Sequence, residues 1–339
     1  MRTAILDVGS NSAHLMIVDL AAGRPIRTLG SVKRPTRLAE SLTSDGHIER
    51  RAIDRVVSAV RAAAGVAGAQ GATELIAFAT SAVRDAANRH DVVAAVADRT
   101  GVALGFLPGR DEARLTFLAA RAWYGWSTGP LLLADIGGGS LEIAAGTGSE
   151  PDLALSMPLG AGRLTRDHLP GDPPHRRHIE RLRHHVADQL GPGLPERLAG
   201  HCADQCHPHA GEPPGSRAVA TSKTFTQLAR LTRGRTRDGR RVLDIKPLRR
   251  QITRLAKLET TERARLPGIS TTRAHQILAG AIVAERLMTA LHLDRLEICP
   301  WALREGIALR RLQQLTAISR QHPDDIDHLL QPIGSGPAR

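Results

Sequence analysis

Aromatic side chains are scarce in this chain of 339 residues, since Phe, Trp and Tyr together make up only 2%. A packed core must therefore come from Ala, Leu, Val and Ile, which dominate the hydrophobic fraction of 42%. The scarcity also argues against an aromatic platform that stacks single-stranded nucleic acid. At this length the chain exceeds one small core, and we expect two domains.

Cysteine is also sparse, and the three residues Cys202, Cys206 and Cys299 cannot form a disulfide framework. The chain lacks the basic segment and apolar run of a secretory signal. Its longest uncharged apolar stretch, residues 277–284, is far too short to span a membrane. We therefore expect a cytoplasmic protein in a reducing compartment, with no membrane partner and with Cys299 buried and inert.

Histidine gathers in one part of the chain, with eight of the fifteen between residues 168 and 209. The run His201-Cys202-x3-Cys206-His207-x-His209 contains ligands that zinc accepts. Its spacing differs from a standard zinc-finger pair, and no second pair follows. We expect a loop exposed to solvent there, with zinc binding as the alternative.

Positive charge is unevenly distributed along the chain. Residues 160–275 hold 23 Lys and Arg against 11 Asp and Glu, whereas the remaining residues hold 23 of each kind, so the whole net charge of +12 lies in that range. The excess is either a solvated arginine-rich surface or a field that attracts a polyanion. No zinc-finger, zipper or RNA-binding motif is present, so no specific nucleic-acid partner is expected.

One motif is present twice, a Gly/Ser turn between two apolar runs. Asp7-Val8-Gly9-Ser10-Asn11-Ser12 follows residues 3–6, and Asp135-Ile136-Gly137-Gly138-Gly139-Ser140 follows residues 131–134. Small residues let backbone N–H groups approach a ligand, and an array of such groups binds phosphate. The Asp at the mouth of each turn can hold a divalent cation. One such turn would be weak evidence, but two copies predict two similar lobes.

Apolar runs and helical spacings alternate along the rest of the chain, which predicts an α/β protein. We expect strands at 75–79, 102–107, 218–222 and 296–299, and helices at 50–70, 112–123, 179–190, 247–257, 272–291 and 303–315. The arginine-rich segment 233–241 is expected to be a solvated loop.

Glu112 lies where a strand ends and a helix begins, a position from which a carboxylate faces the ligands of α/β sheets. It could take a proton from a water that attacks phosphorus, or it could simply stabilise the helix dipole. Ser140 and Glu142 share a face by strand alternation. With Asp135 they supply two carboxylates and a hydroxyl, a set suited to Mg²⁺ that shares phosphate oxygens. The alternative for Glu142 is an ordinary surface residue of a strand.

Three cations also lie near expected helix starts. Arg84 follows Thr80-Ser81, Lys223 follows Thr221-Ser222, and Arg273 opens the helix at 272–291. Each could bind phosphate, the arginines bidentately, or could lie on a solvated helix surface.

At this point the ordered motifs resemble the exopolyphosphatase/guanosine-pentaphosphate phosphohydrolase (Ppx/GppA) family, in a short two-domain form. The resemblance rests on the two turns and on residues 79–86, 109–115, 159–165 and 298–306. It covers roughly residues 3–312 and implies an α/β fold of two ribonuclease H-like lobes, as in the actin/Hsp70/sugar-kinase (ASKHA) superfamily, with the active site in the cleft between them. The implied division is 1–126, 127–302, a helix 303–318 packing on the first lobe, and a frayed tail 319–339.

The resemblance further implies Mg²⁺-dependent hydrolysis of terminal phosphoanhydride bonds, usually in a homodimer. Matched by motif, Glu112 is the catalytic base, Asp135 and Glu142 bind metal, the two turns bind phosphate, and Arg84 lies near the base. With Ser140 as the second catalytic candidate, the predicted substrate-binding residues are Asp7, Gly9, Ser10, Asn11, Ser12, Thr80, Arg84, Gly137, Gly138, Gly139, Lys223 and Arg273.

The resemblance implies inorganic polyphosphate as the substrate. We expect short chains to be included, because the sequence stops before the extra C-terminal helical domains of longer family members. Two departures from the family pattern are Asp111 in place of Glu, and residues 220–222 in place of a Gly-Gly-Thr loop. Guanosine pentaphosphate (pppGpp) is the alternative substrate, although few aromatics are available to stack guanine. An ATP-dependent enzyme of the same fold and a non-catalytic polyanion-binding module are two further hypotheses. The three carboxylates Glu112, Asp135 and Glu142 argue against the binding module.

Overall fold

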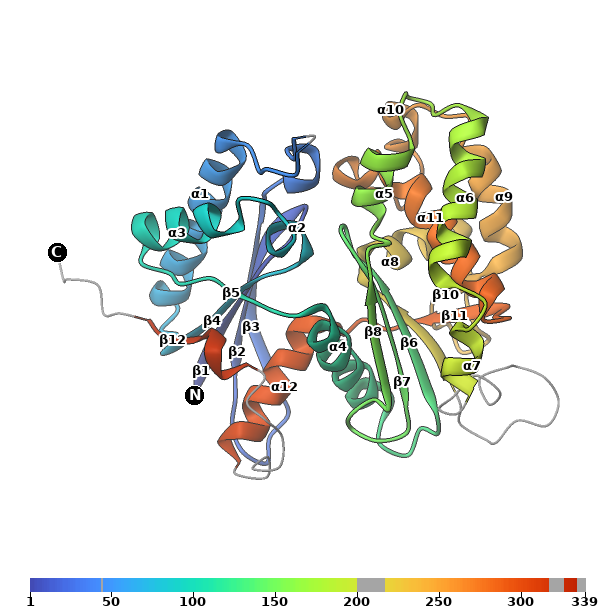
Figure 1. The fold of residues 1–339 in the computed structure, drawn as a ribbon. Coiled ribbons are helices and arrows are strands. Elements are labelled where there is room, and N and C mark those ends of the chain that lie inside the picture. Colours follow the sequence, from blue (N-terminus) through green and yellow to red (C-terminus); the bar gives the residue numbers. More distant parts are fainter. Residues whose placement is uncertain (44, 200–216, 317–325, 334–339) are drawn as a thin grey trace. The chain divides into compact units, whose positions relative to one another are not determined.

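The computed structural model describes residues 1–43, 45–199, 217–316 and 326–333. The chain divides into two compact units (Figure 1). Lobe 1 comprises residues 1–111 and 303–339, and lobe 2 comprises residues 112–302. Each lobe has its own sheet, and the two repeated turns lie one in each lobe.

Lobe 1 contains a mixed sheet in the order β12-β4-β1-β2-β3, with β5 beside β4. β1, β2 and β3 pair antiparallel, whereas β4 runs parallel to β1. The strands are β1 (Arg2–Val8), β2 (Ser12–Asp19), β3 (Arg27–Pro35), β4 (Glu74–Ala79), β5 (Gly105–Phe106) and β12 (Leu330–Pro332). The helices are η1 (Leu38–Glu40), α1 (Arg50–Ala69), α2 (Ser81–Arg84), α3 (Arg89–Thr100), α12 (Leu303–Leu315) and η4 (Asp327–Leu329).

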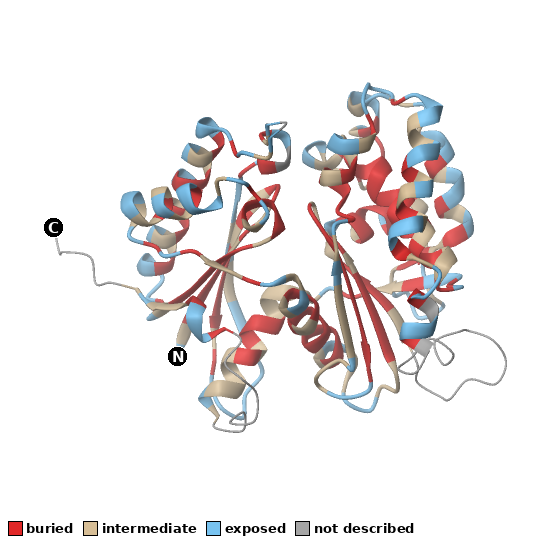
Figure 2. Ribbon diagram, in the orientation of Figure 1, coloured by how far each residue is buried: buried red, intermediate tan, exposed pale blue. Residues whose placement is uncertain are grey.

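Helix α1 shows how a core poor in aromatics is built. Its small apolar residues repeat at helical spacing, and Ala52, Val56, Val60, Ala63 and Ala67 are all buried against the sheet. The opposite side of the helix is exposed (Figure 2). Small side chains therefore allow the helix to lie close to the strands that carry the first turn.

Lobe 2 contains a second mixed sheet in the order β10-β11-β9-β6-β7-β8. β6, β7 and β8 pair antiparallel, β9 and β11 run parallel to β6, and β10 is antiparallel to β11. The strands are β6 (Leu131–Ile136), β7 (Leu141–Gly146), β8 (Leu153–Met157), β9 (Arg217–Thr221), β10 (Val242–Asp244) and β11 (Arg295–Ile298). The helices are α4 (Gly109–Tyr124), α5 (Ala161–His168), α6 (Arg176–Leu190), α7 (Leu194–Ala199), α8 (Ser222–Thr232), α9 (Ile245–Leu255), α10 (Thr260–Arg263), η3 (Thr271–Arg273) and α11 (Ile277–Ala290).

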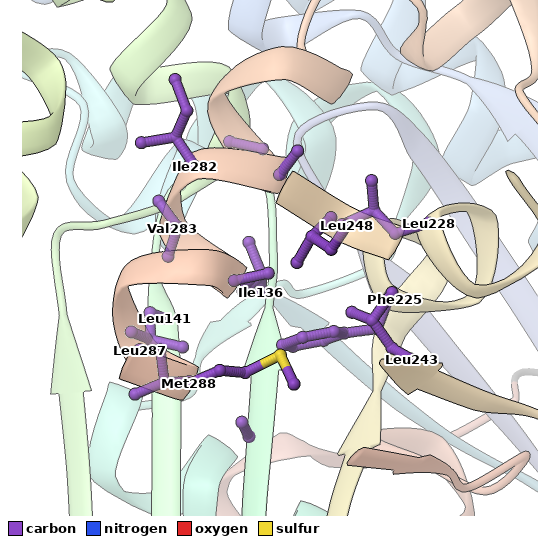
Figure 3. Close-up of a cluster of buried hydrophobic side chains, with 14 of the residues drawn as sticks. Ile136, Leu141, Phe225, Leu228, Leu243, Leu248, Ile282, Val283, Leu287 and Met288 are labelled. Atoms are coloured by element: carbon purple, nitrogen blue, oxygen red, sulfur yellow. The ribbon is translucent and has the colours of Figure 1, made fainter. Parts of the chain in front are cut away.

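The two faces of this sheet are covered differently. Helix α4 packs on one face through Ala113 and Phe117, against Leu133 and Val219. On the other face α5, α6, α8, α9 and α11 form one apolar cluster with the strands. Figure 3 shows part of that cluster, with Met288 of α11 beside Phe225 of α8. Lobe 2 thus has a large core on one side and a single helix on the other.

The structure corrects three expectations. The strand expected at 102–107 shortens to β5, and the helix expected at 272–291 begins at Ile277, after the turn η3. The tail expected to fray beyond 319 contains β12, which pairs with β4 because Ile326 and Leu329 are buried in lobe 1. A few apolar residues in a polar segment were enough to anchor it.

Cys299 is buried beside β9, as expected. The His/Cys run at 201–209, including Cys202 and Cys206, lies outside the described residues. None of the helices among the described residues combines the length and the apolar character needed to cross a bilayer.

Phe225 is a suitable position at which to test the core of lobe 2, because its ring is fully buried within the apolar cluster. We expect Phe225→Ala to lower the free energy of unfolding by about 3–5 kcal/mol, the usual cost of the cavity left by a buried ring. Urea denaturation measures the change. Trp126→Ala is the matched control, because Trp126 is 60% exposed, and it should cost about 0.5 kcal/mol or less. Equal effects of the two variants would contradict the assigned core.

Candidate active site

The carbonyl groups of the first Gly/Ser turn are bound by a neighbouring segment, residues 36–38. The amide of Gly9 donates to the carbonyl of Ser12 at 3.1 Å and closes the turn. The carbonyls of Gly9, Ser10 and Asn11 all accept hydrogen bonds from residues 36–38, at 2.9, 2.7 and 3.0 Å respectively. In a trans peptide the N–H points away from the C=O. The amides of residues 10–12 are therefore directed away from residues 36–38, as a phosphate-binding turn requires.

The second turn is built in the same way from different parts. The amides of Ala161 and Arg163 donate to the carbonyls of Gly137 and Gly138 at 3.0 and 2.9 Å. The carbonyl of Gly139 accepts from Nε of Arg163 at 2.9 Å. With its carbonyls bound to the start of α5, this turn also directs its following amides to the opposite side.

Gly160 makes this packing possible. A Cβ at residue 160 would lie 2.2 Å from the carbonyl carbon of Gly139 and 2.3 Å from the nitrogen of Ser140. These are backbone atoms of the turn itself, so no side chain could move to make room. Glycine at 160 therefore allows α5 to approach the turn closely.

Asp7, at the mouth of the first turn, is held by Arg304 of α12. Nη1 of Arg304 donates to Oδ2 of Asp7 at 3.0 Å, whereas Oδ1 of Asp7 is buried and has no hydrogen-bond partner. Burial raises the pKa of the Asp7 carboxyl, and the charges of Arg304 and Lys33 oppose that rise. A buried carboxylate oxygen without a partner is costly, and it marks a position where a hydrogen-bond donor of a ligand would compensate.

Asp135 occupies the corresponding position in lobe 2. Oδ2 of Asp135 accepts a hydrogen bond from the hydroxyl of Thr221, at the end of the neighbouring strand β9. Arg273 lies nearby: burial lowers the pKa of its guanidinium, and the charge of Asp135 opposes that shift. The structure thus brings together Asp135 and Arg273, which lie far apart in the sequence.

Glu142 lies directly opposite Asp135 in the antiparallel pair β6 and β7. Side chains of opposed residues project on the same face of a sheet, with Cβ atoms about 5 Å apart. Glu142 is buried, and its Oε1 accepts a hydrogen bond from the hydroxyl of Ser156 at 2.9 Å. The two carboxylates predicted to bind metal are therefore neighbours.

Glu112 belongs to helix α4, which packs on this sheet of lobe 2. Alternation along the strands places Asp135, Glu142 and Thr221 on the face that α4 covers through Ala113. Glu112 is the residue before Ala113 and is itself buried. The helix of the candidate base thus covers the sheet face that carries the paired carboxylates, with Ser140 buried at the end of the turn.

The donor set fits a magnesium ion that also uses substrate oxygens. Among the described residues no group of three His, Cys, Asp or Glu side chains could hold a metal. Mg²⁺ needs no such cage, because it commonly binds one or two carboxylates and completes its octahedron with water and phosphate oxygens. Asp135 and Glu142 supply that pair, and the adjacent turn supplies the place for phosphate.

In lobe 1 the residues that lie opposite one another across β1, β2 and β3, in the row that begins with Asp7, have different charges. Asp7 opposes His14, and His14 opposes Lys33 in the next strand. In lobe 2 the corresponding row places Ser156 opposite Glu142. One lobe thus combines its carboxylate with basic groups, whereas the other combines two carboxylates. Only the second row suits a divalent cation.

The remaining predicted residues lie around the turns. Thr80, at the end of β4, donates its amide to the carbonyl of Val8 at 3.2 Å, beside the first turn. Nη1 of Arg84 donates to the carbonyl of Leu107 at 2.7 Å, and its Nε pairs with Asp85. Its role near the base stays a prediction.

Lys223 is exposed and follows Ser222 at the start of α8. Ser222 has φ 79, a backbone region that a serine rarely adopts. Backbone strain of this kind often accompanies functional sites, and here it lies directly after Thr221. The role of Lys223 in phosphate binding stays a prediction.

Sequence reasoning missed the residues that hold the turns. Residues 36–38 carry no motif signal, because their role depends on contacts of the folded chain. Gly160, Arg163 and Arg304 lie within runs that resembled the family, yet no chemistry pointed to their function. A signal was present for Gly160 alone, since a glycine before a helix suggests close approach.

Asp7 predicts a dependence of stability on pH. In the unfolded chain an Asp titrates at about 3.9, whereas burial raises its pKa in the folded lobe. Stability from this group is therefore complete below the unfolded pKa and is lost as the pH rises through the folded pKa. The free energy of unfolding of the wild type should accordingly fall relative to Asp7→Asn as the pH rises above about 4. Urea unfolding at a series of pH values measures this.

Asp98→Asn, at an exposed position of α3, controls for the loss of one negative charge. The free energies of unfolding of the wild type and Asp7→Asn are compared at each pH. The assigned environment of Asp7 would be contradicted if their difference stayed constant, or if it grew in favour of the wild type as the pH rises.

Comparison with known proteins bears on this arrangement. The sequence model of the Ppx/GppA phosphatase family matches residues 16–315. Exopolyphosphatase 1 of Mycobacterium tuberculosis (strain ATCC 25618 / H37Rv) is 48% identical over 316 residues, which cover 92% of this chain and 88% of that protein. The expected family resemblance is thereby confirmed.

Solved structures agree on the fold. An exopolyphosphatase from Cytophaga hutchinsonii matches with a TM-score of 0.79 at 22% identity, covering 93% of this chain and 98% of that chain. A Ppx/GppA family member from Aquifex aeolicus matches with a TM-score of 0.71 at 22% identity, covering 95% of this chain and 99% of that one. The predicted α/β fold of two actin-like lobes is confirmed. With its sequence and its fold in agreement, the chain belongs to the Ppx/GppA phosphatase family.

Proposed function

We propose that this protein is an exopolyphosphatase, which hydrolyses the terminal phosphoanhydride bond of inorganic polyphosphate and releases orthophosphate. One observation carries the proposal: Asp135 and Glu142 lie opposite each other on the sheet face that α4, the helix of Glu112, covers, beside a turn whose amides are directed outward. The substrate class is supported by the Mycobacterium tuberculosis relative, which is named an exopolyphosphatase.

In the proposed reaction the oxygen of a water molecule attacks the terminal phosphorus, and Glu112 accepts a proton from that water. The P–O bond to the next phosphate breaks, and the chain leaves one phosphate shorter. The amides of residues 138–140 bind phosphate oxygens, and their orientation is fixed before substrate arrives. Catalysis of phosphoryl transfer depends chiefly on such positioning and on charge stabilisation.

We propose Mg²⁺ as the cofactor, held by Asp135 and Glu142. When bound, it would neutralise charge on the phosphoryl oxygens. The hydrogen bonds from Thr221 and Ser156 to these carboxylates fix their orientation, as partners of metal ligands commonly do. The first turn with Asp7, Thr80 and the other predicted contacts is proposed to bind further phosphate groups.

Other parts of the proposal rest on the family resemblance and composition. They are a homodimer, a cytoplasmic location, and pppGpp as the alternative substrate, which would link the enzyme to the stringent response. Phosphate-release assays with polyphosphate and pppGpp in parallel compare the two substrates directly.

Glu112→Gln tests the base. Gln keeps the shape of the side chain but cannot accept the proton, so phosphate release from polyphosphate should fall by about 10²–10⁴-fold. Binding of polyphosphate should persist. Steady-state release of orthophosphate measures the rate, and Asp111→Asn, one residue earlier in α4, is the matched control. A rate near that of the wild type would remove Glu112 from the mechanism.

Glu142→Gln tests the metal site. Removing one of two proposed carboxylate ligands should raise the Mg²⁺ concentration for half-maximal activity by about tenfold or more. Titration of phosphate release with Mg²⁺ measures it, and Glu180→Gln, on the exposed side of α6, is the control. An unchanged Mg²⁺ requirement would show that Glu142 does not bind the metal.

A further inference from the structure

The arginine-rich segment expected as a solvated loop forms a hairpin that extends β10. The amide of Val242 donates to the carbonyl of Gly234 at 3.1 Å, Arg235 bridges Arg241 in antiparallel fashion, and the amide of Thr236 donates to the carbonyl of Arg240 at 2.9 Å. We call residues 233–241 the arginine hairpin. Its shape is therefore fixed by backbone contacts.

The register of lobe 2 places this hairpin at the edge of the sheet that carries the second turn. The amide of Ile298 donates to the carbonyl of Arg241 at 2.9 Å, Ile298 opposes Ala220, and Ala220 opposes Ala134. Three strand spacings, about 14 Å, therefore separate Arg241 from Ala134, the residue before Asp135. Because β10 is antiparallel to β11, the hairpin leaves the sheet at the end where β6 and β9 finish.

The hairpin carries more arginines than its neighbouring carboxylates pair with. Arg240 pairs with Asp238 at 2.6 Å and with Glu297 at 2.7 Å. Five other arginines on the hairpin and the adjacent end of α8 make no ion pair within the described part of the chain: Arg230, Arg233, Arg235, Arg237 and Arg241.

Arg241 lies close enough to Arg235 and Arg230 to be repelled by them. Burial lowers the pKa of the Arg241 guanidinium first, and the charges of Arg235 and Arg230 lower it further. Arg230, Arg235 and Arg237 are exposed. An anion bound among them would relieve the repulsion, and its charge would be stabilised by several guanidinium groups at once.

Three other arginines of lobe 2 support the fold. Arg183 and Arg249 both pair with the buried Glu285, at 3.0 and 2.9 Å, and Arg263 donates to the carbonyl of Leu255 at 3.0 Å. The hairpin differs from them, because Arg233, Arg235 and Arg237 are exposed at the end of the sheet where β6 finishes.

We propose that the arginine hairpin, with Arg230, is a second binding site for the polyphosphate substrate, which holds internal phosphates while the chain end lies at residues 137–140. This inference rests on the proposed function. A short chain held by its end at the turn does not reach across about 14 Å, whereas a long chain does. The hairpin therefore favours long chains through KM and leaves the chemical step unchanged.

Kinetics with two substrate lengths test the inference. The triple variant Arg230→Gln, Arg237→Gln and Arg241→Gln removes three charges and keeps the aliphatic stems. For long-chain polyphosphate we expect KM to rise by about tenfold or more, the scale of losing charge-assisted contacts, with kcat unchanged. For tripolyphosphate both constants should stay within about twofold of the wild type. The matched control is Arg176→Gln, Arg177→Gln and Arg181→Gln, three exposed arginines of α6 with the same change in charge.

The proposal would be overturned if KM changed equally for both substrate lengths or changed for neither. It would also be overturned if the control variant showed the same change in KM. Binding of labelled long-chain polyphosphate, measured by fluorescence anisotropy in the Glu112→Gln background, tests the site independently of turnover. There the hairpin variant should bind about tenfold more weakly than its parent and show a smaller dependence on salt.

The binding measurement also separates this inference from the proposed function. If the wild type releases no phosphate from either substrate, the proposed function fails, and retained hairpin-dependent binding would still support the site. If the variant loses affinity for single-stranded RNA of similar length but keeps its affinity for polyphosphate, the hairpin is a nucleic-acid site and the proposal is overturned.

Discussion

The constraint on which the rest of the structure depends is the one-sided fixing of each Gly/Ser turn. In both lobes the turn carbonyls are bound by another segment, residues 36–38 in lobe 1 and the start of α5 in lobe 2. The peptide geometry then directs the following amides to the free side. Because the turn carbonyls are already bound, the turn amides are already oriented when an anion arrives. No reorganisation is then needed, which is the condition for strong electrostatic stabilisation. The glycines serve this arrangement, since the close approach of Gly160 to the second turn leaves no room for a side chain.

The two lobes repeat the geometry but differ in electrostatics. Asp7 and Asp135 lie at equivalent places on equivalent strand pairs, yet Asp7 opposes a histidine and Asp135 opposes Glu142. The partner of Asp7 is a cation, Arg304, whereas Thr221 donates a neutral hydroxyl to Asp135. The repeated framework therefore has one lobe with a pair of carboxylates that suits a divalent cation, and one lobe whose Asp7 carboxylate is paired with Arg304. That difference gives the turns of the two lobes different electrostatic surroundings.

The features of this arrangement that could be predicted from the sequence are those formed by residues close together in the chain. Strand, turn and strand are encoded within about a dozen residues, so both hairpins were expected, and alternation alone placed Ser140 and Glu142 on one face. The opposition of Asp135 and Glu142 follows from the same hairpin. Contacts such as Arg304 with Asp7 join residues nearly three hundred positions apart, and no periodicity reports them. The same holds for β12, whose few apolar residues gain meaning only beside the edge of β4.

Charge illustrates the limit most clearly. The excess of +12 in residues 160–275 indicated a polyanion, but composition cannot tell an arginine that supports the fold from one that meets a ligand. The folded chain makes that distinction through partners. Arg183 and Arg249 neutralise the buried Glu285, which would otherwise carry an uncompensated charge at high cost. Apart from Arg240, the arginines of the hairpin and Arg230 make no ion pair within the described part of the chain, and they lie at the end of the sheet where β6 leads into the second turn. A field focused at one edge raises the local concentration of an anionic chain there, which a diffuse surface charge does not achieve.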